Sequence, residues 1–277
     1  MKYKGASQLA WVDEHGEILK EQGMLGITLE KTTRQDALYG LPVQASQDLT
    51  QIASIPSNIN FADPLSLNRL RVEIDGIQDG VLHLHGGRQR YQAPVLTIEK
   101  ENLRQVNDSQ DQGLSAADRV KFLKPGPLIP SDHEAIQKLA QEITAGVGGG
   151  LQKARRIVDW IQTHIQKRPV LSVPDALAVL ENRVGDCNEH AVLFAALARA
   201  SGIPTRIEAG VVYLKGRFYY HAWNAVYIGN WITLDALFNQ IPADVTHIRL
   251  TSGDPDSQLD ILSLIGSIGI HVLDGTL

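Results

Sequence analysis

The chain of 277 residues contains a single cysteine, Cys187. No intramolecular disulfide can form, and a CxxC redox pair or a zinc site built on several cysteines is excluded. A lone cysteine either fills part of a core or acts as a nucleophile. The residues around Cys187 are therefore the first candidates for a functional site.

Basic residues and long apolar runs are also scarce. Lysine and arginine total 26 against 31 aspartates and glutamates, a formal net charge of −5. The chain thus has no basic field for coating phosphates, and we expect no nucleic-acid partner. No stretch reaches the roughly 18 apolar residues of a membrane helix, and the first residues lack the apolar run of a signal peptide. We expect a soluble chain, and both a cytoplasmic and a cell-envelope location stay open.

The composition that is present, 43% hydrophobic and 21% charged, is typical of a globular protein. At roughly 150 residues per domain, the length predicts one large or two moderate domains. The polar stretch Asn107–Gly113 is a candidate linker. We expect a β-rich N-terminal accessory domain over residues 1–118 and a second domain over residues 119–277.

Strand patterns fill much of the first hundred residues. Arg69–Ile74 alternates apolar and polar residues, which predicts a strand with one buried face. Val81–His85 and Pro94–Lys100 are predicted to be further strands. Near the C-terminus, the apolar residues between Leu259 and Val272 predict a short helix followed by a closing strand.

Helices are predicted in the middle of the chain. Ser131–Glu134 has the pattern of a capping box, and the helix it opens should stop at the glycines that follow Gly146. A second helix is predicted from Ala154 to Ile165, and Pro174 opens a short third one.

Asp186 is the predicted N-cap of a helix that begins with Cys187. At that position the free backbone N–H groups and the positive end of the helix dipole favour a thiolate. This is how a cysteine nucleophile is commonly placed. The alternative is that Cys187 simply starts a buried helix.

A meander of three strands follows, predicted at Thr205–Leu214, Phe218–Ile228 and Trp231–Leu237. The middle strand carries His221 and the last carries Asp235. A thiolate, an imidazole and a carboxylate in this arrangement supply the nucleophile, the general base and the group that orients the base in acyl transfer.

The strand register decides whether His221 and Asp235 can meet. With a two-residue loop at Gly229-Asn230, Asp235 would lie opposite Asn224, and His221 would point to the other face. We therefore predict an odd register, from a three-residue loop or a bulge, with Trp223 opposite Asp235 after the three-residue loop. The expected hydrogen bond between the two side chains is about 2.6 to 3.2 Å.

Other residues nearby are candidates for the base, for substrate contacts or for the oxyanion site. His190 lies one helical turn after Cys187 and could be the base, but no carboxylate is placed to orient it, so a structural or substrate-lining role is favoured. Trp223 could contact substrate or oxyanion, or belong to the core. Asn224 is a further substrate or oxyanion candidate, and it could also form a hydrogen bond with Asp235 or lie on the opposite face of the strand. The backbone N–H of Cys187 is the oxyanion donor that needs no assumption about side chains.

Two histidines on one face of a predicted strand, His83 and His85, have a spacing that could bind a metal. Two ligands do not make a site, and no third is evident. We expect neither a metal nor another cofactor.

Three segments resemble a known family: GDCNEHAVLFAALARASGIPTR, YYHAWNAVYIGNWITLD and FNQIPADVTHIRL. They are similar to the bacterial transglutaminase-like branch of the papain-like cysteine acyl-transfer superfamily, over roughly residues 150 to 250. The resemblance implies that Cys187 is the nucleophile, His221 the base and Asp235 the orienting carboxylate.

The fold implied by the resemblance is α+β, with N-terminal helices, the nucleophile at a helix start and an antiparallel sheet. The resemblance does not fix the reaction, because the thioester can pass to an amine or to water. We expect acyl transfer on amides of a protein or peptide substrate through a cysteine thioester. Two alternatives stay open. A cysteine peptidase or amidase would hydrolyse the same thioester, and a non-catalytic protein-binding module would keep the triad without turnover.

Overall fold

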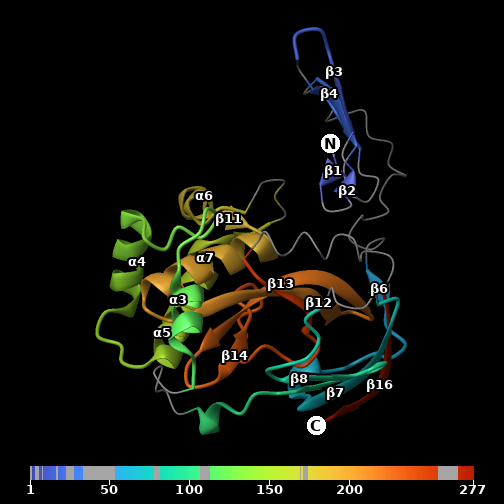
Figure 1. Ribbon diagram of the computed structural model, residues 1–277, viewed down its shortest axis with the longest axis vertical. Helices are drawn as coiled ribbons and strands as arrows, with labels where there is room; N and C mark the ends of the chain where they lie inside the picture. The colour runs from blue at the N-terminus through green and yellow to red at the C-terminus, as the bar shows by residue number, and fades with distance from the viewer. Residues whose placement is uncertain are drawn as a thin grey trace.

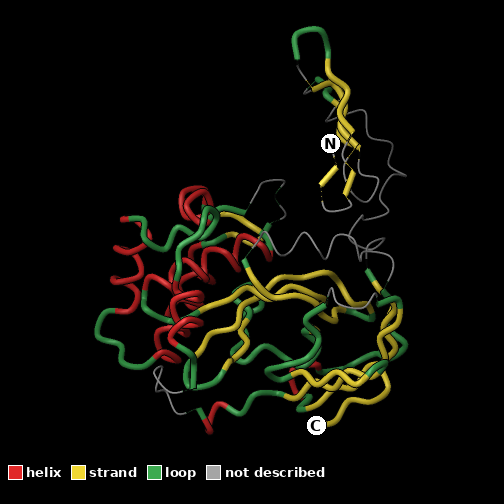
Figure 2. The backbone as a smooth tube through the Cα atoms, viewed as in Figure 1, coloured by secondary structure: helices red, strands yellow, loops and turns green. Residues whose placement is uncertain are grey.

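The computed structural model describes residues 2–3, 6–7, 9–16, 18–22, 28–33, 54–77, 82–106, 113–168, 170, 174–254 and 268–277. Its main body has a layer of helices on one antiparallel sheet, with a second sheet at the other end of the first (Figure 1). Figure 2 shows the helices gathered on one side of this body. The fold is the predicted α+β class.

The helix layer is built around α7, which begins at the predicted position. Its members are α3 (Ala116–Leu123), α4 (Glu134–Thr144), α5 (Gly150–His164), α6 (Ala176–Asn182) and α7 (Cys187–Ala200). α7 packs against α4, α5 and α6 on one side and against strands of the first sheet on the other. Its residues from Glu189 to Arg199 are consequently all buried.

The first sheet has the order β14-β13-β12-β15 and is antiparallel. Its strands are β12 (Thr205–Leu214), β13 (Arg217–Tyr227), β14 (Trp231–Leu234) and β15 (Ile248–Gly253). β6 (Ile55–Pro56) pairs with the start of β13. The predicted meander is therefore present, and it lies directly beneath α7.

The second sheet joins segments from the two ends of the chain. Its order is β16-β7-β9-β8, from β7 (Arg69–Asp75), β8 (Gln89–Gln92), β9 (Val95–Glu99) and β16 (Gly269–Thr276). The predicted strands at Arg69–Ile74 and Pro94–Lys100 and the predicted closing strand are confirmed. Because β16 pairs with β7, this sheet combines strands from both sides of the predicted domain boundary after residue 118. The boundary itself stays a prediction.

Two apolar cores hold these layers together. One lies between the helices and the first sheet and includes Phe194, Ile207 and Val226. The other joins the second sheet to the far end of the first, where Val72 and Val211 are both fully buried. The first sheet thus contributes to both cores.

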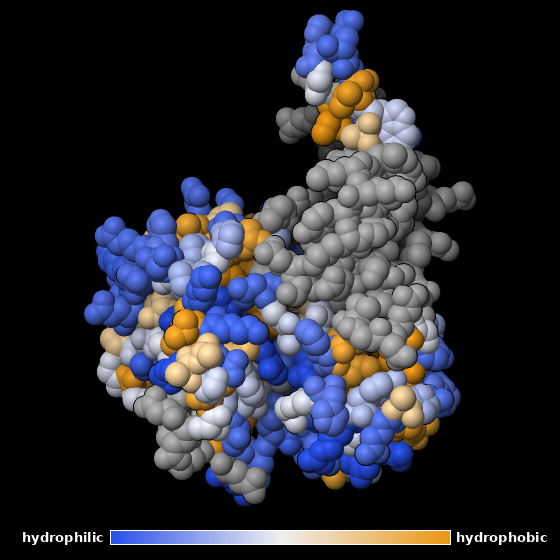
Figure 3. All heavy atoms as spheres, viewed as in Figure 1, coloured by the Kyte–Doolittle hydropathy of each residue, from blue (hydrophilic) through white to orange (hydrophobic). Residues whose placement is uncertain are grey.

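The remaining described elements are short. They are β1 (Lys2–Tyr3), β2 (Ala6–Ser7), β3 (Leu9–Val12), β4 (Ile18–Gln22), β5 (Thr28–Glu30), β10 (Gln166–Lys167), β11 (Val184–Gly185), and the 3₁₀ turns η2 (Pro64–Ser66) and η3 (Leu103–Gln105). β3 and β4 form a hairpin that projects from the body and exposes Trp11, Val12, Ile18 and Leu19 (Figure 3).

Two local predictions were wrong. Residues 82–85 form no strand. The N–H of His83 donates to the Leu250 carbonyl on β15, but its carbonyl accepts from the Arg249 side chain, so the backbone pairing does not continue. Residue 81 lies outside the described residues. The start of α4 is not a Ser131 capping box, since His133 is the N-cap and its Nδ1 accepts from the backbone N–H of Ala135 at 3.2 Å. The predicted helix after Leu259 and most of the linker at 107–113 also lie outside the described residues.

Candidate active site

Cys187 is the first residue of α7, and the helix start is closed by a capping box. Asp186 Oδ1 accepts from the backbone N–H of Asn188 at 3.0 Å, and Glu189 Oε2 accepts from the N–H of Asp186 at 3.0 Å. The predicted N-cap is confirmed. Burial, together with the neighbouring Asp186 side chain, raises the pKa of Glu189 to about 7. Cys187 itself is partly exposed.

The β13–β14 register is the predicted odd one. Tyr227 pairs with Trp231, so the loop has three residues, 228 to 230. Gly229 takes a φ of +86°, a conformation that glycine adopts readily. His221 and Asp235 are therefore able to meet, and His221 Nε2 lies 2.6 Å from Asp235 Oδ2.

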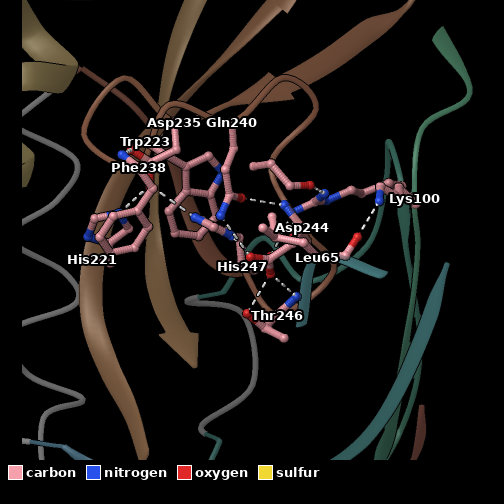
Figure 4. Close-up of polar contacts among 12 residues, drawn as sticks. Leu65, Lys100, His221, Trp223, Asp235, Phe238, Gln240, Asp244, Thr246 and His247 are labelled. Carbon is pink, nitrogen blue, oxygen red and sulfur yellow. Dashed lines mark hydrogen bonds and ion pairs between the residues drawn. The ribbon is translucent and has the colours of Figure 1, made fainter. Parts of the chain in front are cut away.

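Asp235 is buried and all of its acceptor positions are used. Oδ1 accepts from the backbone N–H groups of Leu237 at 2.7 Å and Phe238 at 2.9 Å, in the turn that follows β14. Oδ2 lies 2.6 Å from His221 Nε2 and 3.0 Å from His247 Nε2 (Figure 4). A carboxylate has about four acceptor sites, so this one is fully satisfied in a fixed orientation.

Opposite charges set the ionisation of this buried pair. Burial alone would lower the pKa of His221, but the charge and hydrogen bond of Asp235 outweigh it and raise the pKa to about 10. Burial would raise the pKa of Asp235, but His221 and His247 hold it well below its ordinary value. Together they favour an imidazolium beside a carboxylate.

Cys187 completes the arrangement from the helix side. The charge and polar side chain of Cys187 also favour the imidazolium form of His221 and help to raise its pKa, so Cys187 lies near the ring. Since Nε2 of His221 faces Asp235, the ring leaves Nδ1 for the thiol. The helix start and two neighbouring strands thus bring Cys187, His221 and Asp235 together in that order.

Aromatic rings enclose His221. Phe238 stacks on it with ring centroids 4.9 Å apart and an interplanar angle of 13°. Trp223 lies on the other flank, at 6.1 Å and 21°. Phe238 is the partly exposed member of the pair, and Trp223 is fully buried. Apolar rings on both sides strengthen the electrostatic interactions of the imidazole by excluding water.

The other predicted candidates point into the protein. Trp223 Nε1 donates to Glu208 Oε2 at 3.1 Å, and Asn224 Nδ2 donates to the Ala191 carbonyl at 3.0 Å. His190 Nδ1 lies 2.7 Å from the Asp186 carbonyl. Burial lowers the pKa of His190, which favours the neutral ring. Contacts of His190, Trp223 and Asn224 with substrate or oxyanion stay predictions.

His247 is the main site residue that the sequence did not reveal. It lies in the loop before β15, between Asp235 and a second buried carboxylate, Asp244. FNQIPADVTHIRL contains both residues, but nothing in its spacing links them to Asp235. Only the fold brings this loop beside β14.

Two buried arginines fix the surroundings. Arg249 Nη1 lies 3.1 Å from Glu208 Oε1, the carboxylate that holds Trp223. Burial would raise the pKa of Glu208, but Arg206 and Arg249 lower it to about 2. Arg88, at the start of the second sheet, donates to the carbonyls of residues 243, 244 and 247 and pairs with a buried glutamate. The second sheet thereby holds the loop that carries His247.

A cation could in principle use three of these side chains. The ligand atoms of His221, Asp235 and His247 lie within 4.8 Å of one another. Two imidazoles and one carboxylate suit several transition metals. However, Oδ2 of Asp235 is already hydrogen-bonded to both rings, which accounts for the cluster without a metal. Elsewhere, Nδ1 of His83 and of His85 each accept a backbone N–H.

Residues 137–236 match the family model of the transglutaminase-like superfamily. The chain carries a transglutaminase-like core. This match supports the predicted cysteine-dependent enzyme family. The matched segment begins in α4 and ends directly after Asp235, so it holds Cys187, His221 and Asp235 but neither Asp244 nor His247.

Several solved structures resemble part of the chain. A Cytophaga hutchinsonii protein described as a "putative cysteine protease" is 20% identical, with a TM-score of 0.47, and the match covers 73% of this chain and 83% of that one. The periplasmic domain of TgpA from Pseudomonas aeruginosa is 13% identical, with a TM-score of 0.41, over 69% of this chain and 91% of that one. At these TM-scores the likenesses support no conclusion about activity. No curated protein matches the chain.

No helix in the described part of the chain is both long and apolar enough to span a membrane.

Proposed function

We propose that the protein is a cysteine-dependent acyl transferase that acts on amide groups of protein or peptide substrates. The observation that supports this most directly is the buried 2.6 Å contact between His221 Nε2 and Asp235 Oδ2, with Cys187 near enough to the imidazole to help raise its pKa. A nucleophile, a base and an orienting carboxylate in this order are what acyl transfer requires.

In the first half-reaction the Cys187 thiolate attacks the carbonyl carbon of a glutamine carboxamide or a peptide bond. The carbonyl oxygen becomes an oxyanion, for which the backbone N–H of Cys187 is the proposed donor. The His221 imidazolium gives its proton to the departing nitrogen as the C–N bond breaks. Ammonia or an amine leaves, and a thioester on Cys187 remains.

In the second half-reaction an acceptor attacks the thioester. Neutral His221 takes a proton from an incoming amine or water, and the C–S bond breaks as the thiolate is released. An amine gives a new amide, which is crosslinking or amidation. Water gives a carboxylic acid, which is the peptidase or amidase alternative.

The test uses the purified full chain, a tagged primary amine and glutamine-rich proteins, with products read by mass spectrometry. Amine incorporation that is lost in Cys187→Ala supports the transferase. Cleavage or deamidation that depends on Cys187, without incorporation, replaces the transferase with the hydrolase. A chain that captures the proteins without changing them, and forms no thioester, would be the non-catalytic binding module.

A further inference from the structure

His247 lies between two buried carboxylates. Its Nε2 is 3.0 Å from Asp235 Oδ2, and its Nδ1 is 3.4 Å from Asp244 Oδ1 (Figure 4). The His247 side chain is completely buried, and those of Asp235 and Asp244 are nearly so. Both nitrogens of one ring therefore face carboxylate oxygens in a site that excludes water.

The hydrogen bonds around the two carboxylates determine where the protons sit. Asp244 Oδ1 accepts from the backbone N–H of Thr246 at 2.8 Å and from its hydroxyl at 2.5 Å, and Oδ2 accepts from Gln240 Nε2 at 3.1 Å. Asp235 accepts two backbone N–H groups in addition to the two histidines. Carboxylates that serve as acceptors on both oxygens are ionised, so the protons belong to the ring.

A neutral imidazole carries only one N–H. In that form, one nitrogen of His247 would direct a lone pair at a carboxylate oxygen, and this repulsive contact would be buried. The imidazolium satisfies both contacts, because each nitrogen then donates.

The charged groups that face His247 come from several elements. Asp235 follows β14, Asp244 lies on the loop before β15, and the His221 ring on β13 is 5.7 Å away. The Arg88 guanidinium donates to the His247 carbonyl at 3.0 Å. Burial would lower the pKa of His247, but the hydrogen bonds and charges of Asp235 and Asp244 raise it above its ordinary value.

We propose that His247 is a positioning residue, a buried imidazolium that holds Oδ2 of Asp235 toward His221 and favours the Cys187 thiolate by its positive charge. This inference rests on the proposed function, because it concerns how the same nucleophile is activated. Charges would alternate from Asp244 through His247, Asp235 and His221 to Cys187. Because these side chains are buried, water screens the positive charge of His247 only weakly, and this charge can stabilise the Cys187 thiolate.

The first test reads the protonation of His247 directly. The full chain is labelled with nitrogen-15 histidine, and the His247 resonances are assigned by their absence in His247→Gln. Two protonated ring nitrogens at neutral pH are expected, and loss of one of those protons in Asp244→Asn. A neutral His247 ring in the wild-type chain would overturn the proposal.

The second test is the pH profile of Cys187 alkylation by iodoacetamide, which is site-specific because the chain has no other cysteine. In His247→Gln the amide can still donate to Asp235, but the positive charge is gone. The thiolate then forms at higher pH, so we expect the rate constant near pH 6 to fall about threefold or more, with the plateau at high pH unchanged.

His15→Gln, a change at an exposed histidine on the β3–β4 hairpin, is the matched control and should leave the profile unchanged. A His247→Gln profile that coincides with wild type, while His221→Ala is shifted, would refute the role of His247 and leave the proposed function intact. Wild-type and His221→Ala profiles that coincide would instead refute the activated nucleophile itself. If His247→Gln does not fold, the His247 ring signals are assigned instead through the backbone resonances of the uniformly labelled wild-type chain, and these signals still decide.

Discussion

At the scale of single residues, two histidines near Cys187 have separate roles. His221 contacts Asp235 and has its pKa raised in part by Cys187, whereas His190 donates its Nδ1 proton to the Asp186 carbonyl and is buried as a neutral ring. We expect His221→Ala to slow iodoacetamide alkylation of Cys187 at neutral pH by about tenfold or more, because the thiolate loses its cationic partner. His190→Ala should leave that rate within about twofold. The opposite pattern would move the base to His190.

Asp235 should reveal its buried charge through the pH dependence of stability. Its pKa is lower in the folded than in the unfolded chain, so its contribution is present above the unfolded pKa, about 3.9, and is lost as the pH falls below it. We expect the difference in unfolding free energy between wild type and Asp235→Asn to be largest near pH 5 to 6 and to shrink below about pH 4. It should also shrink above about pH 6.5, because Asp235 raises the pKa of His221 to about 10 and the stabilisation by that charged ring is lost as the pH rises. Urea unfolding over this range measures it. A difference that does not change with pH would contradict the ionised carboxylate.

The same substitution should reduce turnover more than binding. The asparagine amide would present an N–H group where the carboxylate accepts, so His221 would lose its fixed orientation. We expect kcat to fall by about 10² to 10⁴ with little change in KM. An unchanged kcat would remove Asp235 from the proposed triad.

At the scale of elements, the loop between β14 and β15 depends on Arg88. Its guanidinium donates to the carbonyls of residues 243, 244 and 247, which lysine cannot reproduce with one ammonium group. We expect Arg88→Lys to lower the free energy of unfolding by about 1 to 3 kcal/mol and to reduce kcat. Thermal melting and steady-state kinetics would show this.

Arg90→Lys is the matched control for Arg88→Lys. Arg90 pairs with Glu99 on the exposed side of the second sheet, and such pairs contribute about 0 to 1 kcal/mol. If both variants had the same unfolding free energy and kcat, the contacts of Arg88 with this loop would contribute nothing measurable to stability or turnover.

Local signals predict the elements that carry the proposed triad. Asp186 as an N-cap predicts the start of α7. The odd register is predicted because His221 must share a sheet face with Asp235, and side-chain rotation cannot move a residue to the other face of a strand. His247 could not be predicted in the same way. Its contacts with Asp235 and Asp244 depend on how a loop closes over the sheet, and no periodicity encodes that closure.

At the scale of the whole molecule, the last strand completes a sheet begun early in the chain. β16 buries Ile270 and Val272 against the core of the second sheet and covers the edge of β7. Ending the chain before residue 269 would expose this edge and these side chains. We expect a loss of about 3 kcal/mol or more in unfolding free energy, with self-association detected by light scattering. A truncated chain that stayed monomeric, with unchanged stability, would contradict this.

The pairing of β16 with β7 also has a consequence for biosynthesis. Asp75 and Gly269 are partners in the sheet, although most of the chain is translated between them. Pairing between such distant segments is slow, and it cannot begin until β16 has left the ribosome. During translation β7 presents an open edge, and the sheet that carries Arg88 lacks its last strand. The mature arrangement around His247 should therefore form only after β16 has been synthesised and has paired with β7.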